Sequence, residues 1–374
     1  MLSNTYKGMT RIKEVISHLE SIAPRAYQES YDNSGLITGN TEEEIKGIMI
    51  SLYATEEVVE EAIQNGCNLV VAHHPIVFRG LKSLTGRNYI ERTVIKAIKH
   101  DIAIYAIHTN LDNVNQGVNR KICDMIGIQN PQILLPKSQT LNKLTVFVPK
   151  ENADALLNAL SEAGAGNIGN YKNCSFMVSG EGTFQPNELA NPTIGERGKL
   201  EKVQEQRIEV IFPVPLVGRV LAAMHEAHPY EEVAYYLHAL QNENQEVGSG
   251  MIGTLTEAME AAHFLEHLKE RMQLNCIRYT RPPAQKIQRV AVCGGAGSFL
   301  LPRAISRKAD ALVTADFKYH EFFDAEDHLM IADIGHYESE VFTKELIKEL
   351  LSKKFVSFAV HLAKTNTNPV FYYK

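Results

Sequence analysis

The stretch GIMISLYATEEVVEEAIQNGCNLVVAHHP, residues 47–75, predicts a strand, a helix and a second strand in succession. Residues 47–52 and 68–72 are short apolar runs, which are typical of strands covered on both faces. Between them, Thr55 is the expected N-cap of a helix over residues 55–65. Strands that alternate with helices in this way predict a parallel or mostly parallel sheet with helices packed on it.

The same alternation continues on both sides of this stretch. A helical stripe over residues 9–21 precedes it, and a helix near 88–100 and a strand at 103–107 follow it. After residue 250 the alternation returns, and residues 336–354 form its longest amphipathic helix. The other elements expected there are strands at 286–293, 311–313, 329–331 and 356–360 and a helix around 319–326.

The middle of the chain has a different order of elements. A strand, a helix, two strands, a helix and a strand are expected at 143–149, 152–163, 174–184, 207–214, 216–227 and 233–240. This is the order of a ferredoxin-like domain. Pro136 and the polar residues 242–250 bracket it, so we interpret it as an α+β insert that splits one α/β domain. The expected divisions are residues 1–137 and 251–374 for the two halves of the α/β domain and 138–250 for the insert.

The composition excludes several classes of protein. A net charge of −6 and a pI near 6.2 indicate no overall basic surface for nucleic acid. The five cysteines stand singly with no CxxC pair, which argues for a reducing compartment and against a thiolate zinc site. The first residues lack an apolar signal core, and no run approaches the roughly 20 apolar residues of a membrane span. We therefore expect a cytoplasmic protein with no membrane partner.

Three segments end an apolar run with side chains that bind metals. They are VVAHHP at 70–75, AIHTNLD at 106–112 and ADIGHYESE at 332–340. Buried parallel strands present their functional residues at their carboxyl ends, so these segments are expected to meet in one crevice. Because Glu340 is four residues after His336, both face the same side of a helix. The candidate metal ligands are His73, His74, Asp112, His336 and Glu340.

Five ligands are too many for one tetrahedral zinc ion and suit two ions that share a ligand. Adjacent histidines point in different directions, so we place His73 and His74 on different ions, with Glu340 as the bridge. Two divalent ions a few ångströms apart can activate water and hold a transferring oxygen. Nitrogen and oxygen ligands fit Zn²⁺, Mn²⁺, Fe²⁺ or Co²⁺. His108 is a further candidate ligand, or it positions Asp112, or it only packs.

Five motifs, in this order along the chain, closely resemble the NIF3-like family. They are DNSGL at 32–36, AHHPIVF at 72–78, HTNLD at 108–112, GHYESE at 335–340 and NTNPV at 366–370. This family is also called DUF34, and its members are labelled GTP cyclohydrolase 1 type 2 homologues. The insert is similar to that of the longer bacterial members, which resembles CutA/PII-like modules. Its motifs are GAGNIGNY at 164–171, GEGTFQP at 180–186 and HPYEEVAYYL at 228–237.

The resemblance implies a NIF3-like α/β fold with a dinuclear metal site on the same five residues. It also implies a toroidal homohexamer and, from the family label, a nucleotide or another phosphorylated small molecule as ligand. Two positions depart from the family pattern. Tyr53 stands where the family often has an acidic residue, and Ala315 stands where it tends to have glycine. Neither departure affects the five candidate ligands.

Other signals have simpler interpretations. The glycine-rich loop CGGAGSFL at 293–300 follows a strand, and a phosphate cradle or a tight turn would each use it; the glycine spacing favours the turn. His225, His228, Glu231 and Glu232 in the insert are interpreted as a turn and a helix end rather than as a second metal site. His320 is either structural or functional. Ser34, Cys67 and Cys293 lack the sequence context of an activated nucleophile.

The preferred hypothesis is a dinuclear metal-dependent hydrolase that acts on a nucleotide or a phosphorylated small molecule. His108 and Tyr337 are expected to contact the ligands without binding metal, and to position a ligand or transfer a proton. The alternative is a metal-binding scaffold or regulator without turnover, whose insert senses a ligand or contacts a protein. DNA binding inside a ring conflicts with the acidic charge.

Overall fold

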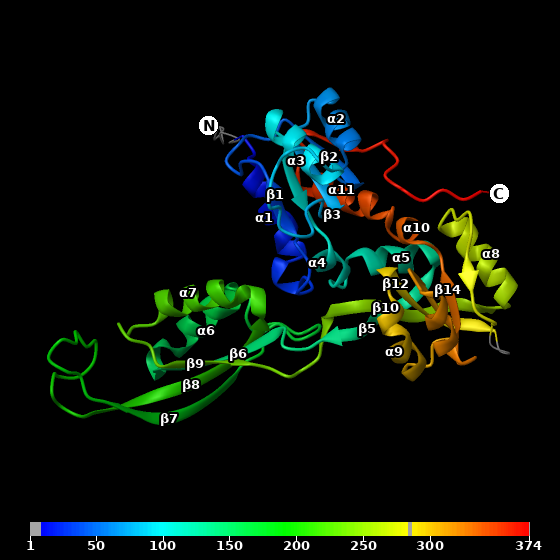
Figure 1. Ribbon diagram of the computed structural model, residues 1–374. Coiled ribbons are helices and arrows are strands. Elements are labelled where there is room, and N and C mark those ends of the chain that lie inside the picture. Colours follow the sequence, from blue (N-terminus) through cyan, green and yellow to red (C-terminus); the bar gives the residue numbers. More distant parts are fainter. Residues whose placement is uncertain (1–8, 283–285, 374) are drawn as a thin grey trace, which may run out of the picture. The chain divides into compact units, whose positions relative to one another are not determined.

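The structure is a computed structural model that describes residues 9–282 and 286–373. The chain forms two compact units (Figure 1). The larger unit takes in the described parts of Met1–Pro136 and Gln245–Lys374, and the smaller unit is Lys137–Asn244. The polar residues 242–250, which the sequence analysis interpreted as a connection, lie largely within a long strand that buries Val247.

One sheet of the larger unit has five strands in the order β1-β4-β3-β2-β15. Their bounds are Gly35–Thr38, Ala103–Ala106, Leu69–His74, Gly47–Tyr53 and Ala359–Leu362, respectively. Neighbouring strands are parallel, except that β1 is antiparallel to β4. Helices α2 (Glu56–Gln64) and α3 (Tyr89–Lys99) pack on one face through a shared apolar cluster. Thr55 caps α2 as predicted, because its hydroxyl accepts a hydrogen bond from the Val58 amide.

The second sheet of this unit has six strands in the order β11-β14-β13-β12-β10-β5. Their bounds are Arg278–Tyr279, Met330–Asp333, Ala311–Ala315, Ile287–Ala296, Asn244–Met259 and Ile128–Lys137. Strands β12, β13 and β14 are parallel, and β10 joins them antiparallel. The sequence analysis expected one sheet and missed β5. This strand contains Pro131 and Pro136, which a strand tolerates at the edge of a sheet.

A single apolar core joins the two sheets. Val71 of the first sheet and Val292 of the second belong to the same buried cluster, together with side chains of α1, α5, α8 and α11. These helices span Ile12–Ile22, Val118–Ile126, Ala261–Arg271 and Thr343–Lys354. The short helix α9 (Leu301–Ser306) contributes to a separate cluster on the second sheet.

The long helix expected over residues 336–354 is divided into two. Helix α10 (His336–Glu340) is followed by Val341 and Phe342 before α11 begins at Thr343. This division lets α10 bury Glu340 while α11 packs its own apolar residues on the core. The helix expected at 319–326 is a 3-10 helix over Tyr319–Ala325.

The smaller unit confirms the ferredoxin-like insert. Its antiparallel sheet has the order β7-β8-β6-β9. The elements are β6 (Leu141–Pro149), α6 (Ala153–Glu162), β7 (Phe176–Phe184), β8 (Glu201–Pro213), α7 (Val217–Ala227) and β9 (Tyr235–Ala239). Both helices share one apolar cluster with the sheet. Across the described residues of both units, every helix is too short or too polar to span a bilayer.

Candidate metal centre

The five side chains that the sequence singled out lie together in the larger unit. His73 and His74 are the last two residues of β3, and Asp112 ends the short helix α4 (Thr109–Asp112), which follows β4. His336 begins α10 and Glu340 ends it, just after β14. All of them therefore come from the carboxyl ends of parallel strands or from the turns that follow, which is why they meet.

Glu340 lies between two groups of side chains. Its Oε1 is 3.9 Å from His73 Nε2, which is itself 3.6 Å from Asp112 Oδ1. Its Oε2 is 2.9 Å from His74 Nε2 and 3.1 Å from His336 Nε2. In each group, His73–Asp112–Glu340 and His74–His336–Glu340, one ligand atom per residue lies within 4.8 Å of the others. Glu340 is common to these two groups, and a third group joins His73 and His74 with His108, so the distances alone do not assign the two histidines to different ions.

These atoms are buried, yet they lack hydrogen bonds. Within residues 9–282 and 286–373, these atoms approach only one another, and none forms a hydrogen bond of good geometry: His73 Nε2, His74 Nε2, Asp112 Oδ1, His336 Nε2 and Glu340 Oε2. Nearly all buried polar atoms in proteins have a partner, so five such atoms at one place need an explanation. Divalent cations bind this type of nitrogen and oxygen atom. His73 is fully buried, while the His336 side chain is 37% exposed, so the cluster reaches the surface on that side.

Two of the histidines are held through their other ring nitrogen. His73 Nδ1 lies 2.8 Å from the Ile107 carbonyl oxygen, and His336 Nδ1 lies 2.6 Å from Asp316 Oδ2. A hydrogen bond at Nδ1 leaves the Nε2 lone pair free to face the cluster, which is the usual arrangement of metal-binding histidines. The sequence analysis assigned no role to Asp316. It directly follows β13, so the rule that found the other residues at strand ends would also have found it.

His108 contacts a different carboxylate from the one expected. Its Nδ1 lies 2.8 Å from Asp32 Oδ1. Within the described part of the chain, the His108 ring forms no hydrogen bond with the Asp112 carboxylate, although the Asp112 amide donates to the His108 carbonyl at 3.2 Å. Asp32 Oδ2 also accepts hydrogen bonds from the Thr109 hydroxyl and from Ser34 Oγ. The His108 ring packs at 5.3 Å from that of His73 and at 4.9 Å from that of His74. Its ligand atom also lies within reach of theirs, so His108 stays a candidate ligand.

The pKa values show how strongly these groups interact in the metal-free protein. Burial lowers the pKa of His73, but Asp112 and Glu340 outweigh burial and raise it to about 9. Burial also dominates at His74 and lowers its pKa to about 4. Burial raises the pKa of Glu340, but the surrounding imidazoles hold it well below its usual value. Because metal ions bind deprotonated ligands, a cation that binds here releases protons.

A cavity of about 700 Å³ lies beside the cluster. His336 and Asp316 form one part of its lining, and the aromatic residues Tyr53, Tyr89, Tyr337 and Tyr372 form much of the rest. Tyr53 stacks on His74 with a centroid distance of 4.3 Å and an angle of 25°. The departure from the family pattern at this position therefore places an aromatic ring directly against a candidate ligand. Tyr337, which the sequence analysis expected near the ligands, lies in the wall of this cavity.

The glycine-rich residues 293–296 form the end of strand β12, where the register with β13 shifts between Val292 and Ala296, and they approach the cluster closely. The Gly294 amide donates to Asn119 Oδ1 and the Gly295 amide to Ser339 Oγ, both at 3.0 Å. These two donors are engaged within the protein, which argues against the phosphate cradle, and the expected tight turn is instead an irregular end of β12. Gly295 has φ +62°, and a Cβ there would lie 2.5 Å from Glu340 Oε1. The absence of a side chain at Gly295 leaves room for the Glu340 carboxylate.

The remaining candidates lie outside the cluster. Both ring nitrogens of His228, at the end of α7, are engaged, with the Phe147 carbonyl and the Tyr230 amide. His320 is exposed and packs against Tyr319. Burial raises the pKa of the Cys67 thiol to about 11, and it also raises that of Cys293. Neither thiol is therefore an activated nucleophile.

Known proteins are similar to this chain along most of its length. The family model Duf34/NIF3 (NGG1p interacting factor 3) matches residues 10–369. A relative from Halalkalibacterium halodurans named GTP cyclohydrolase 1 type 2 homolog is 39% identical over 360 residues, covering 95% of this chain and 97% of the relative. The Bacillus subtilis protein of the same name is 37% identical over 363 residues, covering 96% and 97%. The crystal structure of a Bacillus cereus protein related to NIF3 superposes with a TM-score of 0.85 at 38% identity, covering 98% of this chain and 100% of the other.

Proposed function

Because this chain belongs to the Duf34/NIF3 family and gathers five buried side-chain atoms that face only one another, we propose that it binds two divalent metal ions and hydrolyses a small molecule with them. The proposed substrate is a nucleotide or another phosphorylated small molecule, in keeping with the relatives named GTP cyclohydrolase 1 type 2 homolog. The observation that carries the proposal is the set of five buried atoms without hydrogen bonds, which lies at the edge of a cavity.

Each ion has its own group of proposed ligands. His73 and Asp112 would hold one ion, His74 and His336 would hold the other, and Glu340 would contribute one oxygen to each. Bound divalent ions at such a site lower the pKa of water and stabilise negative charge on a transferring oxygen. Around them, Ile107 and Asp316 orient two of the imidazoles. Asp32 orients the ring of His108, which lies where it can accept or donate a proton at Nε2.

The cavity beside His336 supports a small-molecule substrate. Its volume of about 700 Å³ is within the range of small-ligand sites. Tyrosine side chains in its wall offer flat surfaces on which a planar ring can stack. Arg278 also lines it, with its guanidinium paired with Asp333.

The direct test is turnover by metal-loaded protein. Purified full-length chain loaded with Zn²⁺, Mn²⁺, Fe²⁺ or Co²⁺ is assayed against nucleotides and phosphoesters, with product detected by liquid chromatography. We expect metal-dependent hydrolysis of at least one compound and a loss of about 100-fold or more in His74→Ala, because that variant removes a proposed ligand. Equal turnover by His74→Ala would refute the assignment of the site. Stoichiometric metal binding without turnover would instead favour the scaffold alternative.

Size-exclusion chromatography with light scattering tests the homohexamer that the family resemblance implies.

A second prediction concerns Asp316, which we propose to be a positioning residue for His336. Asp316→Asn keeps the size of the side chain but weakens the hydrogen bond to His336 Nδ1. We expect metal affinity to fall about 10-fold to 100-fold, which is usual when a histidine ligand loses its carboxylate partner. Competition with a chelating dye measures this change. Asp327→Asn is the matched control, because Asp327 has the same φ of 59° and is exposed. An unchanged affinity in Asp316→Asn would contradict the positioning role.

A further inference from the structure

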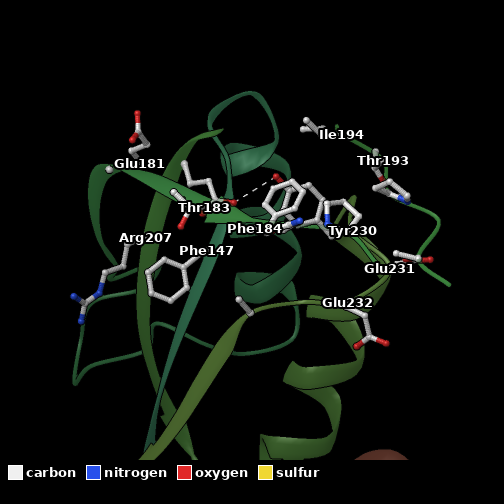
Figure 2. Close-up of a pocket in the computed structure, with 18 of the residues that line it drawn as sticks. Phe147, Glu181, Thr183, Phe184, Thr193, Ile194, Arg207, Tyr230, Glu231 and Glu232 are labelled. Carbon is white, nitrogen blue, oxygen red and sulfur yellow. Dashed lines mark hydrogen bonds between the residues drawn. The ribbon is translucent and has the colours of Figure 1, made fainter. Parts of the chain in front are cut away.

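The smaller unit contains a cavity of its own, which the proposed metal chemistry does not use. It has a volume of about 570 Å³ and lies between β7, β8, the loop 185–200 and the segment 229–234 (Figure 2). All of its lining residues belong to this unit. Its volume is that of a small-ligand site.

Hydrogen bonds hold the loop in place as one wall of this cavity. The Asn191 amide donates to Glu231 Oε1 and the Thr193 hydroxyl donates to the Pro229 carbonyl, both at 2.7 Å. Within the loop, Arg197 Nε donates to the Ala190 carbonyl at 2.7 Å. The loop is therefore joined to the segment that follows α7 at two points, and the cavity is formed before any ligand arrives.

The walls are largely apolar and aromatic. Phe184 and Tyr230 pack edge to face with a centroid distance of 5.8 Å, and Phe147 lies on the neighbouring wall (Figure 2). Pro186 is buried and Ile194 is half-buried in the loop. Aromatic rings of this kind attract both apolar groups and cations, since the ring face is electronegative.

A carboxylate without a cationic partner lies in this apolar setting. Glu205 of β8 is half-buried, and its contact with the Tyr230 hydroxyl is long, at 3.4 Å. No lysine, arginine or histidine of the described chain forms an ion pair with it. Burial raises the pKa of Glu205, as expected for a charge that lacks compensation. Opposite it, Gly182 leaves the carboxylate room, because a Cβ there would lie 2.1 Å from Glu205 Oε2.

The other charges of the cavity have the same sign. Glu181, Glu231 and Glu232 lie at its margins, and Arg207 is the cation of the lining (Figure 2). Arg207 is paired with Glu209, which lies outside the lining. Glu181 is paired with Lys202, while Glu205, Glu231 and Glu232 form no ion pair among the described residues. Three such carboxylates and one paired guanidinium disfavour a phosphate or a nucleotide and favour a positive ligand.

We propose that this cavity binds a small organic cation, namely a protonated amine attached to an apolar or aromatic body. The ammonium group lies at Glu205, and the body packs against Phe184 and Tyr230. The arrangement joins an ion pair at a half-buried carboxylate with a cation–π contact, two interactions that strengthen each other away from water.

Isothermal titration calorimetry of the full chain with phenethylammonium tests the proposal. Phenylacetate and 2-phenylethanol have the same ring without the positive charge, and we expect phenethylammonium alone to bind saturably. Glu205→Gln is expected to weaken this binding roughly 10-fold to 100-fold, which is the usual loss for a hydrogen bond to a charged group. Tyr230→Phe keeps the ring and is expected to change it only a few-fold. Glu188→Gln removes an exposed carboxylate of the same loop that does not line the cavity, and it is expected to bind as the unchanged protein does.

Two controls make the result decisive. Thermal melting verifies that Glu205→Gln is folded, and the His74→Ala variant, with its metal site altered, is expected to bind phenethylammonium unchanged. The proposal is overturned if phenethylammonium does not bind saturably, if phenylacetate binds more tightly, or if folded Glu205→Gln binds equally well. A failure confined to turnover assays would concern the metal site and leave this cavity unaffected.

Discussion

Glu340→Gln is expected to remove metal from both proposed positions at once. Glu340 is 3% exposed, and its two oxygens face different groups of side chains. The substitution preserves shape but removes the negative charge that both ions would share. Substitution of a residue that only hydrogen-bonds a metal ligand already lowers metal affinity about 10-fold to 100-fold. Because Glu340 is itself a proposed ligand of both ions, we expect its substitution to lower metal affinity by more than about 100-fold. Metal content per chain, measured by mass spectrometry after dialysis, reports the result.

The same variant is also expected to lose the stabilisation that metal provides. A ligand at 1,000 times its dissociation constant stabilises the folded state by about 4 kcal/mol. Metal should therefore raise the melting temperature of the unchanged protein and leave that of Glu340→Gln nearly constant. Glu338→Gln is the matched control. Glu338 belongs to the same helix, but it is not one of the five candidate ligands: it lines the cavity and accepts a hydrogen bond from Asn368. Full metal content in Glu340→Gln would contradict the bridging role.

Gly295→Ala is expected to cost both folding stability and metal affinity. A residue with a side chain at φ +62° costs about 1–2 kcal/mol relative to ordinary backbone geometry. The new methyl group would also lie 2.5 Å from Glu340 Oε1, so the carboxylate must move out of its place. Overpacking of a buried site adds about 1–3 kcal/mol. We therefore expect a loss of about 2–5 kcal/mol in the free energy of unfolding together with weakened metal binding, as measured by denaturant titration and a competing chelator.

Gly66→Ala separates the two contributions. Gly66 has a similar φ of +68°, but nothing lies within 4 Å of a Cβ built there. It should therefore show only the backbone cost of about 1–2 kcal/mol and keep its metal. If Gly295→Ala changes the free energy of unfolding and the metal affinity no more than Gly66→Ala does, then the close approach of Gly295 to Glu340 does not affect metal binding.

The parts of the fold that were predictable carry strong local signals. The apolar runs of β2, β3 and β4 and the capped helix α2 were located within one or two residues. The ferredoxin-like insert was also predictable, because the order of its strands and helices is typical of that fold. Strands β1, β5, β10 and β11 were missed. Strands β1, β5 and β11 lie at sheet edges, where strands are often short or contain polar residues and proline, and β10 begins in polar residues that were interpreted as a connection. Their positions depend on pairing with distant strands rather than on their own sequence.

The residues that contact the histidines of the site were harder to predict than the candidate ligands themselves. Asp32 lies 76 positions before His108, and it contacts this histidine only because β1 pairs with β4. Asp316 reaches His336 from a neighbouring strand end. Tyr53 was noted as a departure from the family pattern, but its stacking on His74 follows from the parallel register in which these two residues are paired.

The sequence by itself determined which residue types end the buried strands, because apolar runs followed by histidine and carboxylate are visible without any neighbours. It also determined that the middle of the chain has the order of a ferredoxin-like domain. Only the tertiary structure decided that the larger unit is built from two sheets on one core, and that Glu340 lies between two groups of side chains. Distances between residues more than 200 positions apart depend on how strands pair and helices pack. The local sequence of a segment does not specify which distant segment it will contact.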